Sequence, residues 1–189
     1  MAHAMPLRVA IIGTSGSGKT TFATALAKAT GIVQIELDLI NWRPGWFNRS
    51  RNDIDAFVAE VAEAASQENW VLAGNYTVSR PAYLPRVTDI IWLNLPRWQI
   101  MGQVIARSLA RAASGADVFP GCREDWTRML GPEHPIRWAW DTYEKRNREA
   151  RDMMERPDMA HVQFHRCQSR AEVQRTLQAL ITRFNAQGE

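Results

Sequence analysis

The sequence is poor in residues that could cross-link a fold. Its 189 residues include only two cysteines, Cys122 and Cys167, and no CxxC pair. This scarcity excludes a disulfide framework or a structural zinc site as the basis of the fold, and two free thiols are typical of a reducing compartment. A chain of this length buries about 70% of the surface that its unfolded form exposes, so no such cross-link is needed. We expect residues 1–189 to form one domain.

Long apolar segments are missing as well. The N-terminal stretch MAHAMPLRVAII has only a short apolar run before Gly13, too short for the core of a signal peptide. No later segment approaches the length of a membrane span. These features predict a cytoplasmic protein without a membrane partner.

Lysine is scarce among the basic residues. Only Lys19, Lys28 and Lys145 are lysines among 23 basic residues, and the net charge is +3. Guanidinium groups suit phosphate recognition, but a GC-rich genome gives the same bias, so composition leaves both explanations open. The basic residues are spread along the chain and no nucleic-acid-binding motif occurs, so DNA stays open as a partner without a motif to support it.

Short apolar segments recur along the chain. They lie at about 8–12, 32–37, 70–73, 88–94 and 161–165, with helical periodicity between them. This alternation predicts an α/β fold with a parallel sheet.

Two helix starts have the spacing of a capping box. Ser50 and Asp53 precede an apolar helical face, and Ser169 and Glu172 precede a C-terminal helix. The apolar residues expected to face the core are Ile54, Phe57, Val58 and Val61 in the first helix, and Val173, Leu177, Leu180, Ile181 and Phe184 in the second.

The segment Gly13–Thr20 reads GTSGSGKT, which is the G-x-x-x-x-G-K-T pattern of a P-loop between a predicted strand and a predicted helix. Glycines let the backbone N–H groups point at phosphate oxygens, and the helix dipole adds positive potential. Lys19 would neutralise the β- and γ-phosphates, and the Thr20 hydroxyl would ligate the metal Mg²⁺. ATP and Mg²⁺ are therefore the predicted cofactors. The predicted nucleotide-binding residues are Gly13, Ser15, Gly16, Ser17, Gly18, Lys19, Thr20, Thr21 and Arg111.

Ligands of such sheets bind beyond the carboxyl ends of the strands. Asp38 follows the second predicted strand, with Trp42 and Trp46 in the next loop, and Asn75 and Tyr76 follow the third. The tryptophans are expected either to cover an acceptor ring or to pack against neighbouring helices. Asp38 is a candidate substrate contact, or it caps the turn that follows. Asn75 and Tyr76 are expected to contact the substrate, or they only mark a turn.

Phosphoryl transfer also needs cations on the migrating group. Arg107 and Arg111 lie four residues apart on one helical face and are the first candidates. Lys145, Arg146 and Arg148 are the second, although solvated ion pairs explain such a helix equally well. Arg146 has no acidic residue four positions away, so it is the preferred transition-state arginine.

These motifs together resemble a known family. The ordered set LDLINWRPGW, LAGNY, IIWLNLPRW and RWAW, with the P-loop, is similar to the bacterial DNA topology modulation proteins over residues 7–180. These are relatives of adenylate kinase, with a nucleoside monophosphate kinase-like P-loop fold. The resemblance implies a three-layer fold with a five-stranded parallel sheet in the order 2-3-1-4-5, helices on both faces and a lid at 112–131.

The resemblance also implies roles for individual residues. It places an acceptor site beside Asp38, Trp42 and Asn75, with Asp38 accepting the proton of an acceptor hydroxyl. The chain departs from the family at Ala73 and Asn94, where the family usually has aspartate. Asp38 is therefore expected to be the only carboxylate near the γ-phosphate, within one water's reach of Thr20.

These observations predict an ATP-dependent phosphotransferase, an enzyme of the adenylate kinase-like class. Its partners would be a nucleoside triphosphate and a nucleotide or other small-molecule acceptor. The alternative is a nucleotide-binding regulator that contacts DNA with little or no turnover.

Overall fold

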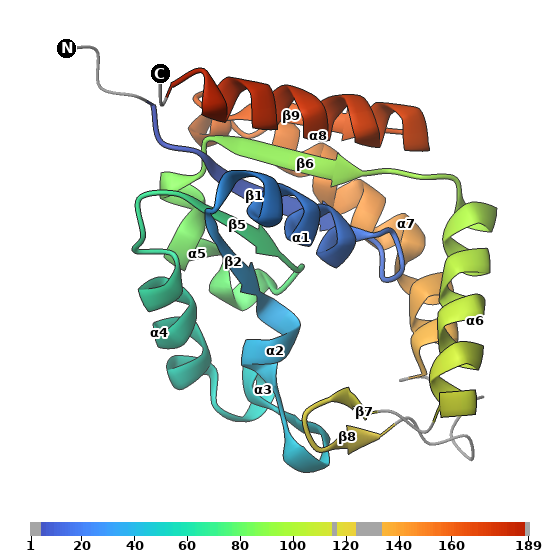
Figure 1. Cartoon of the computed structure of the whole chain (residues 1–189). Coiled ribbons are helices and arrows are strands. Elements are labelled where there is room, and N and C mark those ends of the chain that lie inside the picture. Colours follow the sequence, from blue (N-terminus) through green and yellow to red (C-terminus); the bar gives the residue numbers. More distant parts are fainter. Residues whose placement is uncertain (1–4, 115–116, 124–133, 188–189) are drawn as a thin grey trace.

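A computed structural model describes residues 5–114, 117–123 and 134–187. Its centre is a five-stranded sheet with the order β2-β5-β1-β6-β9, in which every neighbouring pair is parallel (Figure 1). In chain order this is 2-3-1-4-5, so the predicted fold class and strand order are confirmed. The strands are β1 (Arg8–Gly13), β2 (Val33–Glu36), β5 (Trp70–Ala73), β6 (Asp89–Leu93) and β9 (Gln163–Cys167).

Helices cover both faces of this sheet (Figure 1). One face packs against α1 (Lys19–Thr30) and α8 (Arg170–Asn185). The other packs against α4 (Ile54–Ala64), α5 (Arg80–Tyr83) and α7 (Pro135–Met154). α6 (Arg97–Ser114) follows β6 and packs against α7.

Two apolar clusters form the core because successive strand residues point to opposite faces. Ile11 and Ile91 belong to the cluster beneath α1 and α8, whereas Ile12 and Trp92 belong to the cluster on the other face. Parallel strands that are covered on both faces are apolar along their whole length. This is why the central strands β1, β5 and β6 appear in the sequence as short, mostly apolar runs, whereas the edge strands β2 and β9 also contain polar residues.

Short elements complete the chain at the edges of the sheet. Between β2 and α4 lie α2 (Leu37–Asn41), β3 (Trp42–Arg43), a 3-10 turn (Pro44–Trp46), β4 (Phe47–Asn48) and α3 (Arg49–Asn52). Further 3-10 turns are Thr77–Ser79, Leu84–Arg86 and Pro157–Met159, and a hairpin is formed by β7 (Asp117–Phe119) and β8 (Cys122–Arg123). None of the helices in the described part of the chain is both long and apolar enough to cross a bilayer.

One of the two predicted capping boxes is correct. The Ser169 hydroxyl accepts a hydrogen bond from the Glu172 N–H at 3.3 Å and opens α8. The box predicted at Ser50 is wrong, because Ser50 lies in α3 and α4 begins after Asp53 without a side-chain cap. The non-helical residue Asp53, which separates the two consecutive helices, cannot be recognised from the capping-box spacing alone.

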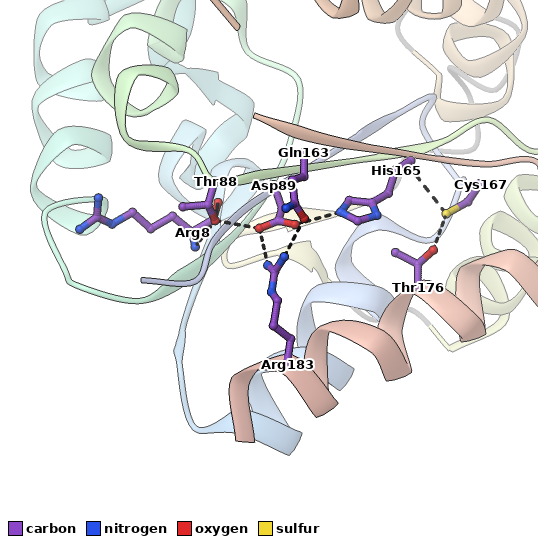
Figure 2. Close-up of polar contacts among 8 residues, drawn as sticks. All are labelled: Arg8, Thr88, Asp89, Gln163, His165, Cys167, Thr176 and Arg183. Carbon is purple, nitrogen blue, oxygen red and sulfur yellow. Dashed lines mark hydrogen bonds and ion pairs between the residues drawn. The ribbon is translucent and has the colours of Figure 1, made fainter. Parts of the chain in front are cut away.

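A buried carboxylate fastens α8 to the sheet at the amino ends of the strands (Figure 2). Asp89 opens β6, and its side chain is only 1% exposed. It contacts Nε2 of His165 on β9 at 2.9 Å and the guanidinium of Arg183 on α8 at 2.5 Å, and it accepts a hydrogen bond from the Thr88 hydroxyl at 2.8 Å. This cluster lies at the end of the sheet opposite the P-loop.

Candidate active site

The loop between β1 and α1 has a conformation that requires glycine. Gly16 has a φ of 81°, and a Cβ at this position would lie 2.1 Å from Cγ2 of Val104 on α6. Gly18 has a φ of 96° and is the N-cap of α1. The backbone therefore turns tightly against α6 and directs the first N–H groups of α1 toward the loop, as the P-loop pattern predicts.

Lys19 folds back over this loop. Its ammonium group donates to the carbonyl oxygens of Gly13 and Thr14, both at 3.1 Å. Burial lowers the pKa of Lys19 to about 8, even though nearby carboxylates oppose the shift. A phosphate group would replace the two carbonyl contacts with a charged partner.

Four charged groups from other elements influence Lys19 electrostatically. Asp38 on α2 and Glu36 on β2 raise its pKa, while Arg107 on α6 and Arg146 on α7 lower it. The fold thus gathers two carboxylates and two guanidinium groups around the P-loop lysine. Three of these four were predicted as catalytic residues from the sequence, and Glu36 was not.

Two hydroxyls of the loop remain unsatisfied. Among the described residues, neither Thr14 Oγ1 nor Ser17 Oγ has a hydrogen-bond partner, although Thr14 is 1% and Ser17 3% exposed. Buried polar groups without partners are costly, so a ligand that supplies acceptors would stabilise the loop. This observation fits phosphate binding. Ser15 lies within the same loop, and Thr21 is an exposed residue in the first turn of α1.

Asp38 was expected to be the only carboxylate near the γ-phosphate site, but a second carboxylate, Glu36, lies beside the P-loop. Thr20 Oγ1 donates to Glu36 Oε1 at 2.7 Å. Glu36 is also the register partner of Ala73 across the β2–β5 pair. The acid that the sequence lacks at position 73 therefore has a counterpart on the adjacent strand, at the same level of the sheet.

A magnesium ion fits these groups. Mg²⁺ is usually held by one or two carboxylates together with substrate phosphates and waters. Thr20 and Glu36 provide a hydroxyl and a carboxylate beside the P-loop, although no group of three or more His, Cys, Asp or Glu residues suited to a metal occurs in the described part of the chain. Burial raises the pKa of Glu36, which its hydrogen bond with Thr20 partly offsets.

Asp38 lies in the first turn of α2, beyond the end of β2. Its Oδ1 accepts a hydrogen bond from the Tyr76 hydroxyl at 2.6 Å. A Cβ on Gly74 would lie 2.6 Å from Cβ of Leu37, and the absence of that atom lets the ends of β5 and β2 approach. Burial, and then Asp38, raise the pKa of Tyr76, so its hydroxyl remains a donor. Asp38 and Tyr76, two of the residues predicted to contact the phosphoryl acceptor, therefore form a hydrogen-bonded pair.

Asn75 faces the P-loop. Its side-chain amide donates to the Gly13 carbonyl and accepts from the Gly13 N–H at 3.4 Å. These bonds tie the end of β5 to the end of β1. A contact between Asn75 and a substrate stays a prediction.

The predicted tryptophans join an aromatic cluster. Trp42 and Trp46 meet edge to face with ring centroids 5.3 Å apart, and Phe119 of β7 stacks on Trp42 at 6.5 Å. Each tryptophan ring thus packs against its aromatic neighbours, while Trp46 remains 38% exposed to solvent. Both roles considered for these rings are compatible with this arrangement.

The β7–β8 hairpin docks on the loop that carries these tryptophans. The Gly45 N–H donates to the Gly121 carbonyl at 3.0 Å, and the buried Cys122 thiol donates to the Arg43 carbonyl at 3.2 Å. This hairpin and residues 112–114 at the end of α6 are the described part of the predicted lid at 112–131, of which residues 115–116 and 124–131 lie outside the described residues. A closing movement stays a prediction.

The predicted arginines occupy two helices. Arg107 is exposed on α6, and Arg111 follows in the last turn of that helix. Arg146 on α7 has no acidic residue four positions away, as the sequence shows, but it forms an ion pair with Glu149, three positions away, at 2.9 Å. The residue three positions away provides the partner that the four-residue spacing missed.

The neutral Asn94 has a structural partner. In the amide orientation that satisfies its neighbours, it accepts hydrogen bonds from the Arg166 guanidinium at 2.7 and 2.9 Å and donates to Asn147 at 3.0 Å. Arg166 in turn lies over the Trp92 ring at 4.7 Å. Asn94, at a position where the resembling family usually has aspartate, therefore links β9 to α7.

Fold and site together define a protein with a P-loop and a kinase-like α/β fold. The model of the AAA family, ATPases associated with various cellular activities, matches residues 9–73. No curated protein sequence matches the chain.

Solved structures share the fold at low sequence identity. A putative kinase from Chloroflexus aurantiacus is 15% identical with a TM-score of 0.56, covering 95% of this chain and 98% of the other. Shikimate kinase from Acinetobacter baumannii, solved with shikimate, is 14% identical with a TM-score of 0.54 and 96% coverage of both chains. A gluconokinase from Sinorhizobium meliloti is 17% identical with a TM-score of 0.52, covering 96% of this chain and 94% of the other.

Proposed function

We propose that the protein is an ATP-dependent phosphotransferase that phosphorylates a hydroxyl group of a small molecule. One observation carries this proposal: Lys19 of the P-loop lies within electrostatic reach of two carboxylates, Asp38 and Glu36, and of two guanidinium groups, Arg107 and Arg146. Phosphoryl transfer depends on positioning and on neutralising the charge of the migrating group. A protein that only binds nucleotide needs no carboxylate directed at the acceptor side of the P-loop.

The proposed division of roles follows from the contacts. The P-loop and Lys19 hold the β- and γ-phosphates, and Thr20 with Glu36 holds Mg²⁺, which supplies charge neutralisation when bound. Asp38, oriented by Tyr76, accepts the proton of the acceptor hydroxyl. The hydroxyl oxygen forms a bond to the γ-phosphorus, the bond between that phosphorus and the bridging oxygen breaks, and ADP leaves. Arg146 stabilises the charge that spreads over the migrating group.

The solved neighbours support a small-molecule acceptor, because those named by substrate are kinases of shikimate and gluconate. Kinship with DNA topology modulation proteins is part of the proposal and rests on the sequence motifs. Despite the name of that family, the resemblance implies kinase-like chemistry for its members as well. A regulator that contacts DNA with little turnover remains the alternative outcome.

A screen for ATP consumption tests the proposal. Purified protein with Mg²⁺ is incubated with nucleosides, nucleoside monophosphates, sugars, hydroxy acids and small alcohols, and ADP is measured. Turnover that depends on one acceptor class supports the kinase. Absence of acceptor-dependent turnover, together with tight and salt-sensitive DNA binding, would favour the regulator.

A further inference from the structure

Glu149 joins two distant parts of the chain at the edge of the proposed site. Its Oε2 lies 2.9 Å from Arg146 on the same helix and 3.2 Å from Arg80 on α5. The three side chains are only 17–24% exposed. Ion pairs that are shielded in this way hold their geometry better than solvated pairs do.

Arg146 influences both halves of the proposed reaction centre electrostatically. It lowers the pKa of Lys19 in the P-loop, and it opposes the raised pKa of Tyr76 at the acceptor side. Its guanidinium group therefore acts electrostatically on a group of the P-loop and on a group beside Asp38. An arginine has several rotatable bonds, so this placement requires a partner that fixes it.

Arg80 gives Glu149 a fixed position relative to the sheet. It opens α5, shortly after the segment that carries Asn75 and Tyr76 beyond β5. Glu149 thus connects α7 to the strand end on which the acceptor residues are carried. Burial would raise the pKa of Glu149, but Arg146 and Arg80 outweigh this and keep it low, so the carboxylate is ionised near neutral pH.

We propose that Glu149 is a positioning residue that holds the Arg146 guanidinium in place for phosphoryl transfer, with Arg80 as its anchor. This inference rests on the proposed phosphotransferase function. Glu149 itself touches neither substrate nor nucleotide. It acts by limiting the conformations of Arg146.

Glu149→Gln is the first test. Glutamine retains the shape and one acceptor oxygen but loses the charge that holds two arginines. Misplacement of a catalytic group by about 1 Å costs up to about 100-fold in rate, so we expect kcat to fall about 10- to 100-fold. The affinity for ATP should change less than about twofold, because the P-loop contacts are intact.

A double-mutant cycle separates positioning from a general structural effect. If Glu149 acts through Arg146, Glu149→Gln should not lower kcat further in an Arg146→Gln background. Arg80→Gln, which removes the anchor of Glu149 and also the contact between Arg80 and the buried Tyr83, should give a smaller loss of kcat that also disappears in that background. Asp141→Asn is the matched control, since Asp141 pairs with Arg137 on the exposed side of the same helix at 3.4 Å.

The outcomes are distinguishable. Loss of kcat in Glu149→Gln that vanishes without Arg146, with unchanged ATP affinity and an unchanged Asp141→Asn control, supports the inference. Wild-type kcat in Glu149→Gln, or equal losses in both backgrounds, overturns it while the proposed function stands. If Glu149→Gln fails to fold, the Arg80→Gln cycle decides by the same criteria. If the wild-type protein transfers phosphate to no acceptor, the proposed function fails, and this inference fails with it.

Discussion

Replacement of Asp38 by asparagine isolates the proposed proton acceptor. The amide keeps the size of the side chain, and its oxygen can still accept the hydrogen bond from Tyr76, which is 2.6 Å long in the native protein. What is lost is the ability to take up a proton. General base catalysis contributes about 10²- to 10⁴-fold, so kcat should fall by this factor, equivalent to about 3–5 kcal/mol.

The expected kinetic pattern is specific. Affinity for ATP should remain close to the native value near pH 7, because Asp38 influences Lys19 only through space. The assay is steady-state ADP formation with the acceptor found in the screen, varied at saturating ATP. Tyr76→Phe is the control: it keeps the carboxylate and removes the hydroxyl that contacts Asp38 and Trp42, so its loss of kcat should be much smaller.

Two results would refute this reasoning. Native kcat in Asp38→Asn with a hydroxyl acceptor would show that no base is needed at this position. An effect confined to KM would mean that Asp38 binds the acceptor without accepting its proton, as expected for an acceptor that is already a phosphate. Thermal denaturation of each variant checks that the fold is retained.

Three further predictions concern other groups. Glu36→Gln should raise the Mg²⁺ concentration needed for half-maximal activity about 10- to 100-fold, with the rate restored at saturating Mg²⁺; equal loss at all Mg²⁺ concentrations would contradict this. Since the pKa of Lys19 is about 8 without ligand and bound phosphate favours the charged form, ATP affinity measured by calorimetry should fall about tenfold per pH unit above 8. Lys19→Arg should bind with little pH dependence. Burial would raise the pKa of Asp89, but hydrogen bonds from His165 and other groups hold it below its usual value, so its contribution to stability is lost as the pH falls below about 4. Asp89→Asn should lower Tm by about 3–12 °C at neutral pH, and the Tm of the variant should fall less than that of the native protein when the pH is lowered below about 4.

The sequence predicts the P-loop and the sheet well because both depend on local patterns. The G-x-x-x-x-G-K-T spacing requires a strand before it and a helix after it, and apolar runs mark strands that are buried on both faces. β5 coincides with the predicted 70–73 segment, while β9 begins at Gln163, two residues after the predicted start of 161. Strand ends vary because the apolar pattern continues into the flanking loops.

The residues missed in the site depend on contacts between segments that are distant in sequence. Glu36 shares a sheet level with Ala73 only after β2 pairs with β5, and no spacing along the chain reveals this. The pair between Arg80 and Glu149 likewise joins residues that are 69 positions apart. The pair between Arg146 and Glu149 could have been predicted from the sequence, because residues three positions apart on a helix are neighbours, as are residues four positions apart.

The most direct test of the central claim is the stoichiometry of phosphoryl transfer. Wild-type protein is incubated with ATP, Mg²⁺ and the acceptor identified in the screen, and ADP and phosphorylated acceptor are quantified by mass spectrometry, alongside Lys19→Ala. A phosphotransferase should form equal amounts of ADP and phosphorylated acceptor, and the Lys19→Ala variant should form neither product. Formation of ADP without phosphorylated acceptor, or undiminished transfer by Lys19→Ala, would contradict it.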